Sequence, residues 1–169
     1  MKNMKNKVKI ALTFFISLAF CACQEQSATN EIHKLQRQAK ADIKAMQHIE
    51  KEYYAEANED YHFCDSMLQF VPKEKLEEYF NTLNLAQAYL IQFQEVKPVM
   101  ERKFDYLQQQ LENLQDDIAT NYVNDSLANI YLSDEQKVAD TLHEQVLYFS
   151  DRLSAQKNEL NSLRKAMKQ

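Results

Sequence analysis

The sequence has 169 residues, a formal net charge of −5, no glycine and two prolines. Tight hairpin turns and phosphate-binding loops both favour glycine, so strand-rich folds and nucleotide-binding folds are disfavoured. The excess of acidic residues also disfavours nucleic acid as a partner, because such a surface repels the phosphate backbone.

The N-terminal segment has the pattern of an export signal. Four lysines and no acidic residue precede an apolar stretch that runs from Ile10 to Phe20. This stretch has eleven residues, whereas a helix that spans the hydrocarbon of a bilayer needs about 20. We therefore predict that residues 1–22 form a cleavable signal peptide.

A cysteine motif follows this segment. In Phe20-Cys21-Ala22-Cys23, small Ala22 precedes the second cysteine and an apolar residue stands three positions before it, which resembles the lipobox of bacterial lipoproteins. The resemblance implies cleavage before Cys23 and acylation of its thiol and its new amino group, and two or more acyl chains hold a protein stably on a bilayer. The residue after Cys23 is Gln24 rather than aspartate, which in enteric-type systems implies passage to the outer membrane. The resemblance therefore predicts a lipid-anchored protein of the cell envelope, on either the periplasmic or the surface face.

Alternatives remain at this segment. Leu18-Ala19-Phe20-Cys21 is a competing lipobox, although bulky Phe20 then occupies the site where the peptidase requires a small side chain. Ordinary secretory cleavage and an uncleaved anchor are further interpretations. Removal of residues 1–22 takes away four of the 20 Lys and Arg and none of the 25 Asp and Glu, so the mature chain carries 16 minus 25, or about −9.

Helical periodicity dominates the rest of the chain, which we divide into a tether (23–29) and one helical bundle domain (30–169). The first apolar stripe repeats every three or four positions and predicts a helix from about Asn30 to Phe70. Its members are Leu35, Ala39, Ile43, Met46, Ile49, Tyr53, Ala57, Cys64 and Leu68.

A second helix is predicted to begin at Pro72, because proline disfavours helix in the residue before it and suits the first position of a new helix. Its first half is apolar on several sides, which predicts a buried, central helix. The apolar residues concerned are Leu76, Tyr79, Phe80, Leu83, Leu85, Ala86, Tyr89, Leu90, Ile91 and Phe93. Pro98 either kinks this helix or ends it, and the sequence leaves both possibilities open.

The last two stripes have the spacing of coiled-coil seams. One consists of Met100, Phe104, Leu107, Leu111, Leu114 and Ile118, and the other of Leu142, Val146, Phe149, Leu153, Gln156, Leu160, Leu163 and Met167. The polar stretch from Thr120 to Ser133 is predicted to be the loop between them, with Ser133 and Gln136 as a capping box. Gln156 is a polar residue on the second seam, where it could set register or lie at a wet edge.

These elements predict an all-α fold. It is an elongated antiparallel bundle of three to four long helices with coiled-coil-like seams, and helices of 35 to 40 residues would be about 50 to 60 Å long.

Two histidines follow a carboxylate at a spacing of three, Glu59 with His62 and Asp140 with His143. The pattern resembles half of the ligand set of ferritin-like di-iron bundles, which also require a glutamate from each of two further helices. One glutamate is replaced by aspartate here, and no further pair stands out. These four residues are weak candidates for a metal site, and we predict no metal and no cofactor.

Cleavage before Cys23 would remove Cys21, and acylation would modify Cys23, so Cys64 would carry the one free thiol of the mature chain. We predict that Cys64 is buried, with a reactive or pairing thiol as the alternative. The sequence has no glycine-flanked nucleophile and no recognisable catalytic cysteine, so we predict that the protein is not an enzyme. Nine tyrosines either edge the core or contact a partner.

Two hypotheses for the function follow. The first is a membrane-anchored, non-enzymatic helical interaction or scaffold protein, which binds another envelope protein or itself. The alternative is a helical bundle that binds a ligand or a metal.

Overall fold

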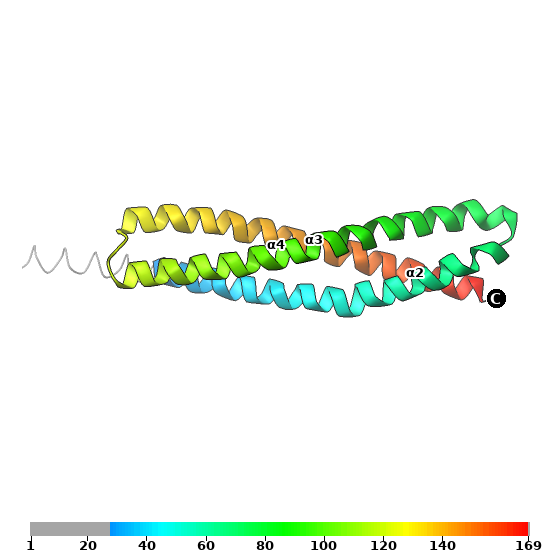
Figure 1. The fold of residues 1–169 in the computed structure, drawn as a ribbon, viewed down its shortest axis with the longest axis horizontal. Helices are drawn as coiled ribbons and strands as arrows, with labels where there is room; N and C mark the ends of the chain where they lie inside the picture. Colours follow the sequence, from blue (N-terminus) through cyan, green and yellow to red (C-terminus); the bar gives the residue numbers. More distant parts are fainter. Residues whose placement is uncertain (1–27, 169) are drawn as a thin grey trace, which may run out of the picture.

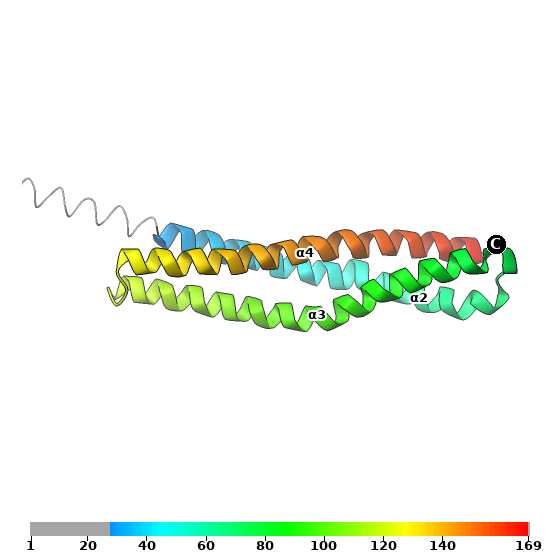
Figure 2. The same ribbon diagram turned by 90° about the horizontal axis from the view of Figure 1, so that it is seen from above.

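The structure is a computed structural model that describes residues 28–168, so the predicted signal peptide and Cys23 lie outside the described residues. Within this range there is no strand, and three long helices lie side by side in an elongated bundle (Figure 1). Consecutive helices run antiparallel, because a short turn reverses the chain at each end (Figures 1 and 2). The predicted all-α bundle is confirmed, and it has three helices.

The first helix, residues 28–70, changes helix type in its middle. Its parts in chain order are the α-helical residues 28–48, the π-helix η1 (Ile49–Tyr54), α2 (Ala55–Met67) and the 3-10 turn η2 (Leu68–Phe70). The positions that face the core step by four and three, but two consecutive steps of four lead from Ile49 through half-buried Tyr53 to Ala57. The wider turn of a π-helix takes up the one additional residue, so the apolar face stays turned toward the core on both sides of it.

The second helix, α3 (Lys73–Ala119), is a single helix of 47 residues that contains Pro98. Pro72 occupies its N-cap, one residue before the helix begins. A proline inside a helix removes a backbone hydrogen bond and displaces the preceding turn, which bends the axis. Figure 2 shows α3 changing direction near its middle. The chain therefore bends at Pro98 and does not reverse there.

The third helix, α4 (Asp125–Met167), begins much earlier than predicted. Its N-cap is Asn124, whose Oδ1 accepts a hydrogen bond from the backbone N–H of Leu127 at 3.0 Å. In the turn before it, Asn121 has a φ of 55°, a left-handed conformation that asparagine adopts more readily than most residues.

The predicted loop over Thr120–Ser133 is therefore confirmed only for residues 120–124 and is wrong beyond them. The predicted capping box is also wrong, because Ser133 and Gln136 lie inside α4. Ser126, Asn129 and Ser133 lie on the exposed face of α4, whereas Asn121 belongs to the turn and Asn124 is the N-cap. The buried face of this stretch is carried by Ala128 and Leu132, which extend the seam of α4 back to the turn.

The prediction that the first half of α3 is buried on several sides is also wrong. One face is buried, including Tyr79 and Leu83, but other apolar residues remain at the surface. The exposed fractions are 40% for Leu76, 52% for Phe80, 48% for Leu85 and 46% for Ile91. In a bundle of three helices, each helix has neighbours on one side only, so a second apolar face has nothing to cover it.

The two ends of the bundle differ in what they carry. Residue 28 and the turn of residues 120–124 lie at one end, and the turn of residues 71–72 and the C-terminus lie at the other (Figure 1). At about 1.5 Å per residue, α3 alone is roughly 70 Å long. No helix among residues 28–168 combines the length and the apolar character needed to cross a membrane.

Candidate functional site

Glu59 and His62, the first pair of weak metal candidates, do not act together. The carboxylate of Glu59 accepts a hydrogen bond from Nη1 of Arg164 at 3.0 Å. His62 is exposed, and its ring makes an edge-on contact with Tyr61, with 5.4 Å between centroids. Glu59 is therefore engaged by a cation of α4.

Asp140 and His143, the second pair, lie at another level of the bundle. Nδ1 of His143 is 2.8 Å from Oδ1 of Asp42, whereas Arg164, which contacts Glu59, lies about 32 Å further along α4 at ~1.5 Å per residue. The structure does not bring the four candidates together. Within the described part of the chain, no group of three or more His, Cys, Asp or Glu side chains is placed to hold a metal ion.

Two acidic residues that the sequence analysis missed lie in the core face of the first helix. Asp42 and Asp60 are each 5% exposed, and both occupy positions where the spacing of four and three requires an apolar residue. The signal was present in that spacing. The predicted apolar stripe contains Ile43 in place of its neighbour Asp42, but Ile43 is only partly buried.

Three side chains of α4 contact polar groups of the first helix. His143, Lys157 and Arg164 follow one another at 14 and 7 positions, so they lie on one flank of α4. His143 contacts Asp42, and Nη1 of Arg164 binds Asp60 in addition to Glu59.

Lys157, the second of these three residues of α4, contacts the first helix in and just after the π-helix η1. Its Nζ lies 2.8 Å from Oε2 of Glu56 and 3.0 Å from the backbone carbonyl oxygen of Glu52. The hydrogen bond with Glu56 raises the pKa of Lys157. Polar side-chain contacts thus join the first helix to α4 at Asp42, at residues 52–56 and at residues 59–60, and those of Lys157 and Arg164 are ion pairs.

Lys97 has the same role at the junction between the first helix and α3. It occupies a seam position of α3 beside Pro98, and its Nζ lies 3.1 Å from Glu50 and 2.8 Å from Glu101. The hydrogen bond with Glu101, and that with Glu50, raise the pKa of Lys97. Aromatic packing of Tyr54 on Phe93, with 5.4 Å between centroids, continues this junction.

Cys64 is fully buried, as predicted. Its Sγ lies 3.9 Å from the carbonyl oxygen of Leu160 on α4. Burial, followed by the nearby carboxylate of Asp60, raises the pKa of the thiol to about 11. Because the thiolate is the reactive form, this cysteine behaves as a small core residue.

The junction between α3 and α4 is different. We use the name α3/α4 groove for the surface channel that these two helices line. Within the described residues, no ion pair links α3 to α4, and the side-chain hydrogen bond between them runs from Tyr148 Oη to Gln92 Oε1 at 3.3 Å. No charged pair closes this groove.

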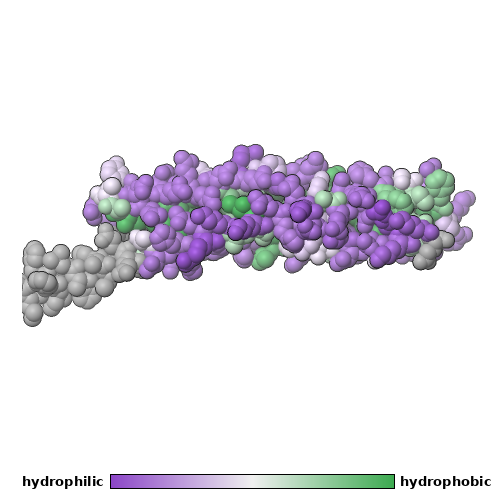
Figure 3. All heavy atoms as spheres, turned by 90° about the horizontal axis from the view of Figure 1, so that it is seen from below, coloured by the Kyte–Doolittle hydropathy of each residue, from purple (hydrophilic) through white to green (hydrophobic). Residues whose placement is uncertain are grey.

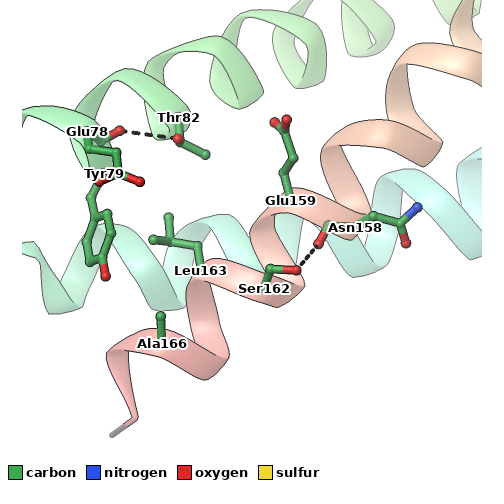
Figure 4. A pocket seen from close by; sticks show the side chains of 8 residues that line it. All are labelled: Glu78, Tyr79, Thr82, Asn158, Glu159, Ser162, Leu163 and Ala166. Carbon is green, nitrogen blue, oxygen red and sulfur yellow. Dashed lines mark hydrogen bonds between the residues drawn. The ribbon is translucent and has the colours of Figure 1, made fainter. Parts of the chain in front are cut away.

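Figure 4 shows the end of the α3/α4 groove nearest the C-terminus. The hydroxyl of Thr82 donates to the carbonyl of Glu78, and that of Ser162 donates to the carbonyl of Asn158 (Figure 4). Each hydroxyl therefore binds a carbonyl oxygen of its own helix. A hollow of about 470 Å³ lies between α3 and α4 at this level.

Further hollows continue along the same groove. One of about 380 Å³ is lined by Lys103, Tyr106, Lys137, Val138, Thr141 and Leu142. Another, of about 370 Å³ near the turn of residues 120–124, is lined by Gln110, Asn113, Leu114, Asp117, Tyr131 and Glu135. Hollows of this size fall in the range of ligand and partner sites.

The middle of the α3/α4 groove is rich in exposed apolar side chains. Their exposed fractions are 48% for Leu85, 39% for Val99, 59% for Tyr106, 37% for Val138 and 39% for Tyr148. The guanidinium of Arg152 lies over the rings of Tyr89 and Tyr148, 5.7 Å from each centroid. Tyrosine and arginine with apolar neighbours are typical of protein interfaces.

A second apolar area lies at the end of the bundle that carries the turn of residues 71–72. Phe70 is 71% exposed and borders a hollow of about 310 Å³ together with Met67, Val71 and Met167. Figure 3 shows hydrophobic atoms at this end on an otherwise largely hydrophilic face.

Comparison with known proteins adds no assignment, since no family, no curated protein and no solved structure matches this chain. The function must therefore be argued from the geometry above.

Proposed function

We propose that this protein is a lipid-anchored component of the bacterial cell envelope that acts as a non-enzymatic helical interaction protein. One observation carries the proposal. Ion pairs link the first helix to α4 and to α3, whereas within the described residues none links α3 to α4, and the α3/α4 groove exposes apolar side chains along its middle. Exposed apolar side chains gathered along one groove are a feature of interaction sites.

The proposed anchor is an acylated Cys23, five residues before Ala28. Five residues span at most about 18 Å even when fully extended, so an acylated Cys23 would hold this end of the bundle close to the lipid surface. The opposite end, with Phe70, would then stand about 70 Å from the membrane. The anchor would lie in the outer membrane, on either its periplasmic or its surface face. In this arrangement the α3/α4 groove is accessible to other proteins of the envelope.

The polar groups of the core take part in contacts between helices. Asp42, Asp60 and Lys97 each contact a side chain of a neighbouring helix. These groups contribute to the register of the helices.

The test compares the wild-type chain with Cys23→Ser in its own cells. Metabolic labelling with a radioactive or alkynyl fatty acid, followed by membrane fractionation, is expected to show label and membrane location for the wild type alone. Chemical crosslinking and affinity purification are then expected to recover a partner with the lipidated form. Unlabelled, soluble wild-type protein contradicts the anchor, and a strictly monomeric chain that recovers no partner contradicts the interaction role.

A further inference from the structure

We propose that the α3/α4 groove binds one amphipathic helix of another protein, about 20 residues long, with carboxylates beside its apolar stripe near its centre. This inference rests on the proposed interaction role and specifies the chemistry of the partner.

The size of the apolar surface fits a helix. On α3 it extends from Leu85 to Tyr106, about 32 Å at ~1.5 Å per residue, which matches a helix of about 20 residues. Val138 and Tyr148 supply the opposite wall from α4. A channel lined by the outer flanks of two packed helices is the place where a further helix completes a four-helix bundle.

The charges along the groove predict the charge of the partner. Carboxylates lie at both ends, with Glu78 and Glu159 at one and Asp117 and Glu135 at the other. Toward the middle, Lys103 and Arg152 lie on the two walls of the groove, whereas Lys137 is paired with Asp134 at 2.8 Å. In a chain with a net charge of −5, this separation favours a partner that is acidic opposite the middle of the groove.

The same charges argue against a second copy of this chain as the occupant. Two copies that matched their apolar middles groove to groove would place Lys103 and Arg152 against the same cations of the other copy. Like charges brought together at an interface are unfavourable, and this disfavours the symmetric dimer. The occupant is therefore a helix of a different protein.

Site-specific photocrosslinking in the full chain, in its own cells, tests this. A photoreactive amino acid replaces Tyr106 or Val138 in the groove, Phe70 at the end of the bundle, or Gln94 as the control. Gln94 is exposed on α3 seven positions before Glu101, on the flank toward the first helix. We expect adducts from Tyr106 and Val138 at least tenfold above those from Gln94. Mass spectrometry should place them on one amphipathic, acidic helical peptide of another protein.

The outcomes separate this inference from the proposed function. Adducts that form from Gln94 or from Phe70 but not from the groove keep an interaction role and overturn the groove as its site. Groove adducts to peptides of this chain, or to a basic or non-helical peptide, overturn the proposed occupant. No adduct from any position overturns both proposals.

A charge reversal provides a second readout. Lys103→Glu combined with Arg152→Glu is expected to lower the Tyr106 adduct at least tenfold. The matched control is Lys40→Glu with Lys44→Glu, which makes the same charge change at exposed positions of the first helix and leaves the adduct unchanged. Thermal melts of the variants show that the bundle is intact. Equal loss in both double variants, or loss in neither, overturns the proposed charge pairing.

Discussion

Nδ1 of His143 lies 2.8 Å from Oδ1 of Asp42 and joins α4 to the first helix. The side chain of Asp42 is 7% exposed, and its other oxygen, Oδ2, is buried with no hydrogen-bond partner among the described residues. An acid at an apolar seam position thus depends on one imidazole from a helix 101 positions away in sequence.

His143→Ala is expected to destabilise the bundle by about 1–3 kcal/mol, because it leaves the buried Asp42 carboxylate without a partner. Asp42→Leu is expected to cost less or to stabilise, because leucine suits the seam and His143 is half exposed. Urea unfolding followed by circular dichroism measures both, with the exposed Glu144→Ala as the control. A larger loss in Asp42→Leu than in His143→Ala would contradict this account of the pair.

Glu135 makes the stability depend on pH. It sits at a seam position of α4, its Oε2 is buried without a hydrogen-bond partner, and burial followed by the nearby Asp134 raises its pKa from 4.5. The folded state therefore holds this proton to higher pH than the unfolded state. Its stabilising contribution is fully present below pH ~4.5 and is lost as pH rises through the folded-state pKa.

Glu135→Gln is accordingly expected to raise Tm at pH 7 by a few degrees relative to the wild type, and the difference should shrink toward pH 4. Thermal melts across this range measure it, with the exposed Glu112→Gln as the control. A Tm difference that does not change with pH would mean that the Glu135 side chain is not desolvated in the bundle.

The π-helix η1 predicts an unusual tolerance to deletion. Removal of Lys51 turns the two successive steps of four, from Ile49 to Ala57, into a step of four and a step of three, and an ordinary α-helix then keeps the seam. We expect a change in stability of less than about 1 kcal/mol. Removal of Asp151 from α4 shifts every later core residue off the seam and should unfold that half of the bundle. Comparable melts for the two deletions would show that η1 does not absorb an extra residue.

Cys64 should resist alkylation in the folded protein. The mature chain with Cys23→Ser contains this one thiol, so its reaction with iodoacetamide at pH 8 reports on Cys64 alone. Because the thiol is buried and its pKa is raised to about 11, we expect labelling at least 100-fold slower than in 6 M guanidinium chloride. Fast labelling of folded protein would place the thiol at the surface.

The sequence by itself determined the helical class and most of the seams. Steps of four and three from Met100 to Ile118 and from Leu142 to Leu163 predict amphipathic helices, because periodicity is a local property that a helix turns directly into a face. Cys64 lies on the first apolar stripe and is buried as predicted, and the preferences of proline placed the start of the second helix at Pro72, one residue before Lys73 where it begins.

Only the tertiary structure decided which apolar faces are covered. The exposure of Leu85 and Tyr106 depends on how many helices surround α3. The pairing of Asp42 with His143 depends on which residues of the first helix and of α4 lie side by side after the chain has reversed twice. The sequence allowed Pro98 either to bend its helix or to end it. In the structure both halves of α3 pack in the bundle, and the helix continues through Pro98 with a bend. The open α3/α4 groove follows from the same cause, since a groove is a property of neighbours in space and no single helical stripe contains it.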